Sequence, residues 1–323
     1  MDPLPSQLPP GAFTTQDAMR AGLTPSRLRG PAVQRIFSGA YLAGDSEVTL
    51  ALLVEAALRV APSDAVVTGV TALRCYGLAV GPLRPLHLVT THVHPVRRPG
   101  LQVTRTAVLP AARHRVVHAE RAFVGAAPAL DLVELVSAGD HLVRTRQVTS
   151  ELLVATASTA RGRGALLARR AAGLVRARVD SPRETELRLC LVLAGLPEPE
   201  CNPLVGDEFE AVGRVDMRYR EFGVLLEYEG DQHRRDRWQW NRDIERHEGF
   251  AAEGRTLVRM TAARMNRPRA VVGRVLQALR AGGYKGPDPK FTAEWVALFS
   301  PSVRESRRRR AFEPLSRTLD DPR

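Results

Sequence analysis

The strongest constraint on the fold is an alternation of polar and apolar residues in the segment "RVDMRYREFGVLLEYE", residues 214–229. Apolar side chains at every second position are typical of a strand with one buried face. The alternation stops at "REFG", and the apolar run "VLLEYE" follows this turn. Two strand-like segments joined by a short loop that contains glycine predict an antiparallel β-hairpin.

The predicted hairpin brings acidic residues together. If the loop consists of Glu221 and Phe222, then Asp216 lies directly opposite Glu227, whereas a three-residue loop with a glycine bulge shifts this pairing by one position. Glu229 lies two residues farther along the second strand, and therefore on the same face as Glu227. Like charges on adjoining strands destabilise a sheet unless something offsets them.

A metal ion is one explanation for this acidic cluster. Mg²⁺ or Mn²⁺ binds one or two carboxylates together with water and phosphate oxygens, which suits phosphodiester hydrolysis. His233 follows closely and is predicted to orient or deprotonate the attacking water, or to protonate the leaving oxygen. The alternative is that the acids pair with Arg218, Arg234 and Arg235 on a solvated sheet edge. Three acids and a histidine at one strand end favour the metal site.

A capped helix is predicted ahead of the hairpin, in "SPRETELRLCLVLAGL". Ser181 is the expected N-cap, Pro182 occupies the first helical position, and Glu184 completes a capping box. Gly195 ends the helix. Capping is by itself a complete structural explanation for Glu184.

The N-terminal segment predicts a small DNA-binding module. In "FTTQDAMRAGLTPSRLRG", Thr14 or Thr15 caps a short helix, Gly22 ends it, and Thr24-Pro25 begins a second helix. The following "VQRIFSGAYLAG" predicts a hairpin around Ser38-Gly39, as in the wing of a winged helix. A small docking module is the alternative. The basic residues predicted to face the DNA backbone are Arg27, Arg29 and Arg35.

The charge of the chain supports a nucleic-acid partner. The 323 residues carry a formal net charge of +12, and the sequence pI is about 10.7. A basic surface attracts phosphate and releases counterions on binding. All basic residues are arginine except Lys285 and Lys290, a bias typical of a GC-rich genome. The same bias excludes a P-loop or Schiff-base lysine before residue 285.

The cellular compartment is also predicted. Cys75, Cys190 and Cys201 are widely spaced and form no metal or disulfide pattern, which favours a reducing compartment. The N-terminus has no signal-peptide pattern, and no apolar run approaches eighteen residues. We therefore expect a cytoplasmic protein with no membrane association.

Four segments differ in residue composition and in predicted secondary structure, within an overall α/β (α+β) fold. We expect a winged helix at 1–46, a mixed α/β middle domain at 47–178, a domain with a mixed sheet flanked by helices at 179–284, and a basic, flexible tail at 285–323. The run of arginines from Arg307 to Arg310 either contacts nucleic acid or is solvated.

Residues 181–284 resemble a nuclease family. Asp216, "LLEYEGDQH" and "RRDRWQWNRDIERHEGFAAEGRTLVRMTAARM" are similar to the restriction-endonuclease-like domain of very-short-patch-repair endonucleases, in the PD-(D/E)XK superfamily. The resemblance implies Mg²⁺-dependent DNA cleavage. One acid departs from the superfamily pattern, because Glu229 stands at the usual lysine position. The residues to which the resemblance gives a role in catalysis, metal binding or support of the site are Glu184, Asp216, Glu227, Glu229, His233 and Asp243.

The N-terminal two-thirds is similar to a second family on shorter motifs. The segments quoted above, together with "VTGVTALRCYGL", resemble the AbiEi-like antitoxins of type IV toxin–antitoxin systems. That resemblance implies a DNA-binding transcriptional regulator, with a toxin as a possible partner. Two functions are therefore expected from the sequence: a metal-dependent DNA endonuclease, in which Arg234 and Arg235 also contact DNA, and a catalytically inactive regulator.

Overall fold

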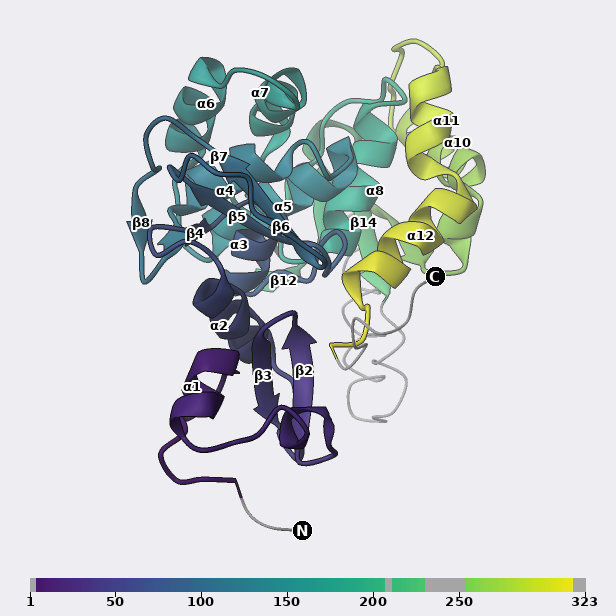
Figure 1. The fold of residues 1–323 in the computed structure, drawn as a ribbon. Helices are drawn as coiled ribbons and strands as arrows, with labels where there is room; N and C mark the ends of the chain where they lie inside the picture. Colours follow the sequence, from purple (N-terminus) through teal and green to yellow (C-terminus); the bar gives the residue numbers. More distant parts are fainter. Residues whose placement is uncertain (1–3, 207–210, 230–253, 316–323) are drawn as a thin grey trace. The chain divides into compact units, whose positions relative to one another are not determined.

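The computed structural model describes residues 4–206, 211–229 and 254–315 (Figure 1). The fold is α/β, as the sequence predicts. The chain forms two compact units. The first contains the residues up to 130, 151–170 and those from 307 onward, and the second contains 131–150 and 171–306.

The first unit begins with a small sheet and a helix. Its elements are β1 (Phe13–Thr14), α1 (Thr15–Arg20), the 3₁₀ turn η1 (Arg27–Arg29), β2 (Val33–Phe37) and β3 (Ala40–Ala43). The sheet has the order β1-β3-β2 and is antiparallel throughout. Gly39 adopts a φ of 84° in the turn between the antiparallel strands β2 and β3, so the predicted hairpin is confirmed.

The predicted capping of the first helix is also confirmed. The hydroxyl of Thr14 accepts a hydrogen bond from the backbone N–H of Asp17 at 3.1 Å, and the Asp17 carboxylate accepts one from the Thr14 N–H at 2.9 Å. This reciprocal pair is a capping box. Phe13, Ala18, Leu23, Leu28 and Val33 pack together as the core of the module.

The second helix of the predicted helix pair forms only one turn. The Thr24 hydroxyl accepts from the Arg27 N–H at 3.3 Å, so the predicted cap is present. The turn η1 ends at Gly30, which is extended because Pro31 follows it. Pro31 disfavours helical backbone at Gly30, so the turn does not continue past Arg29.

A larger mixed sheet completes the first unit. Its elements are α2 (Leu50–Val60), β4 (Val66–Val67), α3 (Gly69–Cys75), β5 (Leu86–Thr90), β6 (Arg97–Arg98), β7 (Leu101–Arg105), β8 (Ala112–Arg113), β9 (Val116–Val117), α4 (Ala119–Ala126) and α6 (Ser150–Thr159). The strand order is β6-β7-β5-β4-β9-β8, with parallel pairs β5/β7 and β4/β9. The five residues of β5 are buried, and helix α3 packs against this strand and against α4. The expectation of a mixed α/β region here is confirmed.

The second unit contains a mixed sheet flanked by helices. Its elements are α5 (Leu132–Arg144), α8 (Pro182–Val192), β10 (Glu200–Cys201), β11 (Leu204–Gly206), β12 (Ala211–Arg214), β13 (Met217–Tyr219), η2 (Arg220–Phe222), β14 (Val224–Glu229), β15 (Thr256–Thr261), η4 (Arg264–Asn266), α10 (Pro268–Ala281) and α11 (Ala293–Phe299). Strands follow the order β10-β13-β14-β15, in which only β14/β15 is parallel. Helix α10 contacts β15 and α8, and α8 contacts α5. Helices α7 (Ala165–Leu174) and α12 (Pro301–Ala311) have residues in both units, as does α6 through its first residue, Ser150.

The C-terminal segment differs from the flexible tail that the sequence predicted. Helices α11 and α12, yellow in Figure 1, occupy much of it. Trp295 is only 2% exposed, and its Nε1–H donates to the Cys190 carbonyl at 2.9 Å. Arg304 forms a buried pair with Glu186 at 2.7 Å. The segment folds because Trp295, Leu298 and Phe299 form an apolar stripe at helical spacing.

No helix in the parts of the chain that the structure describes is long and apolar enough to cross a membrane.

Candidate acidic site at the ends of strands β10, β13 and β14

The register of the β13–β14 hairpin places two acids opposite each other. Tyr219 pairs with Val224 and Met217 pairs with Leu226, so continuing this register places Asp216 opposite Glu227. This is the first of the two registers that the sequence allowed. The connection is a 3₁₀ turn, η2, that ends at Gly223 with a φ of 62°, rather than a two-residue loop. The first paired residues are Tyr219 and Val224 rather than Arg220 and Gly223. Each strand is therefore shorter by one residue at the turn, and the register is unchanged.

Asp216 is held by backbone groups of the strands on both sides. One carboxylate oxygen, Oδ2, accepts a hydrogen bond from the Tyr228 N–H of β14 at 2.6 Å. The backbone carbonyl of Asp216 accepts from the Asn202 N–H, next to β10, at 2.8 Å. The carboxylate thus lies against the β14 backbone between Glu227 and Glu229, in a fixed position.

Asn202 is a residue of this site that the sequence analysis missed. It has a positive φ of 47°, is 9% exposed, and follows β10 directly. Its side-chain amide donates to Glu184 Oε2 and to the Arg178 carbonyl, both at 2.7 Å. Asparagine tolerates this left-handed conformation better than most residues. The only signal in the sequence was an asparagine before a proline, Pro203, which is common in turns.

Half of the predicted capping box is present, because the Ser181 hydroxyl accepts from the Glu184 N–H at 3.2 Å, while the Glu184 carboxylate bonds to groups other than the Ser181 N–H. Glu184 Oε1 accepts from the Ser181 hydroxyl at 2.8 Å, and its Oε2 accepts from the Asp180 N–H at 3.0 Å as well as from Asn202. The side chain is buried, at 7% exposed. Glu184 is therefore connected to Asp216 through a single residue, Asn202, which bonds to both.

Arg259 is the second residue that the sequence analysis missed. In the parallel register of β14 and β15, Arg259 pairs with Glu227, so the two share a face of the sheet. The Arg259 Nε lies 3.4 Å from Glu229 Oε1. Both side chains are partly exposed, at 41% and 46%. An arginine therefore offsets part of the like-charge cost that Asp216, Glu227 and Glu229 impose.

The predicted convergence of three carboxylates is not observed. Within 4–206, 211–229 and 254–315, no group of three or more His, Cys, Asp or Glu side chains could hold a metal ion. Glu229 instead forms a partly exposed ion pair with Arg259. Asp216 and Glu227 remain opposite each other, and two carboxylates are enough for Mg²⁺, which keeps several waters. The other residues predicted for this site lie outside the described residues; they are His233, Arg234, Arg235 and Asp243.

The basic residues predicted to contact DNA belong to the first unit. Arg29 is exposed on η1, Arg35 is exposed on β2, and Arg27 is half-buried on η1. Of the two arginines on the short η1, only Arg29 is therefore fully exposed.

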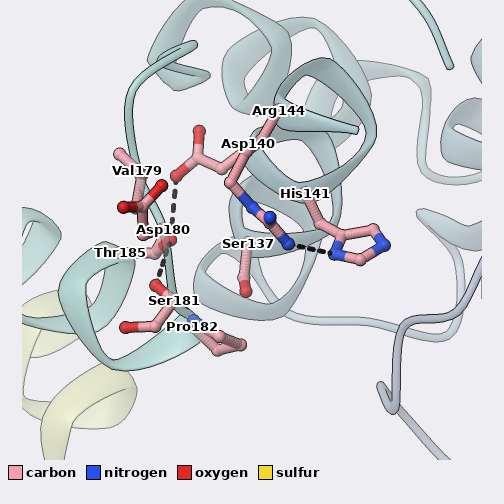
Figure 2. A pocket seen from close by; sticks show the side chains of 9 residues that line it. All are labelled: Ser137, Asp140, His141, Arg144, Val179, Asp180, Ser181, Pro182 and Thr185. Atoms are coloured by element: carbon pink, nitrogen blue, oxygen red, sulfur yellow. Dashed lines mark hydrogen bonds between the residues drawn. The ribbon is translucent and has the colours of Figure 1, made fainter. Parts of the chain in front are cut away.

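A small pocket between α5 and the start of α8 does not belong to the acidic site (Figure 2). Its volume is about 20 Å³, room for about one water molecule. Asp140, in its wall, accepts from the Thr185 hydroxyl at 2.8 Å and forms an ion pair with Arg188 at 3.3 Å. Burial raises the pKa of Asp140, and Arg188 opposes this shift. The small volume of the pocket, and the bonds that its wall residues make within the protein, indicate a gap in side-chain packing that is lined by polar groups.

Replacing Asn202 is expected to destabilise the second unit. Asn202→Gly removes the side-chain amide that donates hydrogen bonds to Glu184 and to the Arg178 carbonyl. We expect this to lower the free energy of unfolding by about 1–3 kcal/mol. Asn202→Ala should cost about 1 kcal/mol more, because alanine is strained at a positive φ. Urea denaturation of the two variants beside wild type measures both effects. Equal stability of all three proteins would show that the Asn202 bonds contribute nothing.

Comparisons of the chain with models of protein families, with curated proteins and with solved structures found no match.

Proposed function

We propose that this protein binds DNA and hydrolyses its phosphodiester bonds with the help of Mg²⁺ or Mn²⁺, acting as an endonuclease. The observation that carries the proposal is the position of Asp216 opposite Glu227 at adjoining strand ends, with the Asp216 carboxylate fixed by the Tyr228 N–H at 2.6 Å. A pair of carboxylates held in this way fits a hard divalent cation that also needs water and phosphate oxygens as ligands.

Each described residue has a defined part in the proposal. Asp216 and Glu227 would hold the ion, which when bound would polarise the phosphate and lower the pKa of a bound water. Asn202 and Glu184 position Asp216 through the bonds described above. Arg259 lies on the same face as Glu227 and would attract a phosphate of the substrate. The role of His233 as proton acceptor stays a prediction from the sequence.

The test is nicking of supercoiled plasmid by the purified full chain with Mg²⁺, with Mn²⁺ and with EDTA. We expect cleavage with either metal and none with EDTA. The Asp216→Ala, Glu227→Ala double variant should bind DNA as well as wild type and cut nothing. The proposal fails if the wild type binds duplex DNA yet cuts neither plasmid, single strands nor mismatched duplexes.

A second candidate, a DNA-binding regulator without catalytic activity, is favoured by one observation. Glu229 stands at the lysine position of the resembled superfamily and is paired with Arg259, and the only lysines of the sequence are Lys285 and Lys290. In this case the acidic site would be a scaffold, and the small N-terminal module would perform the function.

Both candidates need the N-terminal module for DNA binding. The Arg29→Ala, Arg35→Ala double variant is expected to bind duplex DNA about tenfold more weakly, and to lower the slope of log affinity against log salt by about 2, because two phosphate contacts are lost. Fluorescence anisotropy across a salt series measures both quantities. The matched control is Arg105→Ala, Arg113→Ala, which removes two exposed arginines from β7 and β8. An equal loss in the control would mean that only net charge matters.

A further inference from the structure

A groove in the second unit lies outside the acidic site. It has a volume of about 420 Å³ and lies between the start of α10 and the junction of α11 with α12. This volume is within the usual range of binding pockets and is large enough for one or two side chains. The residues that line it are Arg267, Pro268, Arg269, Ala270, Trp295, Val296, Ser300 and Pro301.

The floor of the groove is apolar and closed to a nucleic-acid base. Trp295 is 2% exposed and packs between Phe291 and Phe299, with ring centroids 4.6 and 5.3 Å away. Its faces are therefore not available for stacking, which single-stranded nucleic acids require of an aromatic platform. Val296 is 40% exposed at the groove, which suits contact with an aliphatic or aromatic side chain.

The rim of the groove is positively charged. Arg267 and Arg269 are exposed, and the lining contains no acidic residue among the residues that the structure describes. Arg269 also lies over the Phe291 ring, 5.2 Å from its centroid, which holds its guanidinium beside the groove. The α10 helix of 14 residues starts here without a side-chain cap and without an acid in its first turn. A positive helix end and two arginines together favour negative groups at this rim.

We propose that this groove binds a segment of a partner protein in which an apolar side chain is flanked by carboxylates. The apolar side chain would fill the space beside Trp295 and Val296, while the carboxylates would bond to Arg267 and Arg269. The inference goes beyond DNA binding and cleavage, since it concerns a protein partner and uses none of the residues of the acidic site.

The test uses the full chain and a panel of fluorescein-labelled octapeptides in which leucine, phenylalanine or tryptophan is flanked by aspartates. Fluorescence anisotropy should show saturable binding of at least one peptide. Binding should be lost when its aspartates become asparagine, and also when its apolar residue becomes serine. The Arg267→Ala, Arg269→Ala variant should bind at least about tenfold more weakly.

Two variants control for net charge and folding. Arg220→Ala, Arg274→Ala removes two exposed arginines from the same unit outside the groove and should bind the peptide like wild type. Val296→Asp, at a partly exposed position, should keep the melting temperature of wild type and abolish peptide binding.

Four results would overturn the proposal. The first is the absence of binding by every acidic peptide at millimolar concentration, and the second is an equal loss in the control double variant. The third is binding of a labelled DNA oligonucleotide that depends on Arg267 and Arg269, while binding of the peptides does not depend on them. The fourth is a dimer, seen by sedimentation velocity, that Val296→Asp dissociates, because the groove would then hold a second copy of the chain. None of these results depends on whether the acidic site cuts DNA.

Discussion

Asp216→Asn and Glu227→Gln are each expected to slow plasmid cleavage at least about 100-fold, because each removes a negative ligand that the other cannot replace. Loss of metal-assisted charge stabilisation is worth several kcal/mol, and each 1.4 kcal/mol is a factor of ten in rate. The substitutions keep the shape of the side chains. In particular, the amide oxygen introduced by Asp216→Asn can still accept the hydrogen bond from the Tyr228 N–H, so a loss of rate without a loss of stability would assign the effect to charge.

Two further acids of the same strand hairpin serve as comparisons. Glu229→Gln should lower the rate less than Glu227→Gln does, since Glu229 already pairs with Arg259 at 3.4 Å. Glu221→Gln, on the exposed turn η2 at the other end of the hairpin, should have no effect. Initial nicking rates at saturating Mg²⁺ measure all four variants. Equal rates for Asp216→Asn and wild type would exclude Asp216 as a metal ligand.

Arg188→Met is expected to destabilise the protein by about 3–5 kcal/mol, the usual cost of breaking a buried ion pair from one side. Arg188 is fully buried, with its Nη1 2.8 Å from Glu198 Oε1 and its Nη2 2.8 Å from the Leu174 carbonyl. Nη2 also lies 3.3 Å from Oδ2 of Asp140, which is 1% exposed. The variant leaves this carboxylate buried without its cation. Urea denaturation at pH 7 measures the loss.

The loss should depend on pH in a defined direction. Burial raises the pKa of Asp140 and Arg188 lowers it, so the pKa rises further in the variant. An acid with a raised folded-state pKa stabilises fully below its unfolded pKa of about 3.9, and this contribution is lost as pH rises through the folded value. The variant should therefore be closest to wild type at acidic pH, and its deficit should grow toward neutral pH.

Two controls test the cause of this loss. Adding Asp140→Asn should restore at least about half of the lost stability, because it removes the unpaired charge. Arg280→Met breaks an exposed pair with Asp288 and should cost less than about 1 kcal/mol. The ion-pair explanation is wrong if the double variant is no more stable than Arg188→Met, or if the deficit is the same at every pH.

Local patterns in the sequence predicted the local structure well. The reciprocal cap of Thr14 and Asp17, the wing turn at Gly39 and the cap formed by Ser181 and Glu184 depend on residues a few positions apart, whose geometry the backbone dictates. The two-residue period of the strands predicted the hairpin and narrowed the register to two, and the structure has the one that pairs Asp216 with Glu227. A different turn did not change this register, because a slip would expose the buried face.

The same patterns failed where a feature depends on distant segments. The C-terminal run of arginines predicts a flexible tail that contacts nucleic acid or is solvated. The apolar stripe of Trp295 and Phe299 instead packs as a helix, and its burial depends on segments that are distant in the sequence. The hairpin alone predicts that Glu229 faces a metal ion, because it gives no information on Arg259, the residue of β15 that lies beside Glu229. Parallel strands are joined by long connections, so the register that brings Arg259 to Glu229 has no local signal.

By itself, the sequence determined the α/β class, the capped helices and the hairpin that brings Asp216 near Glu227, since short-range sterics, hydrogen bonding and the strand period settle these. Only the tertiary structure decided that Asn202 connects Glu184 to Asp216, that Arg259 forms an ion pair with Glu229, and that Arg188 is buried against Asp140. Each of these contacts joins residues from different elements, and such contacts form only when burial of apolar surface brings those elements together.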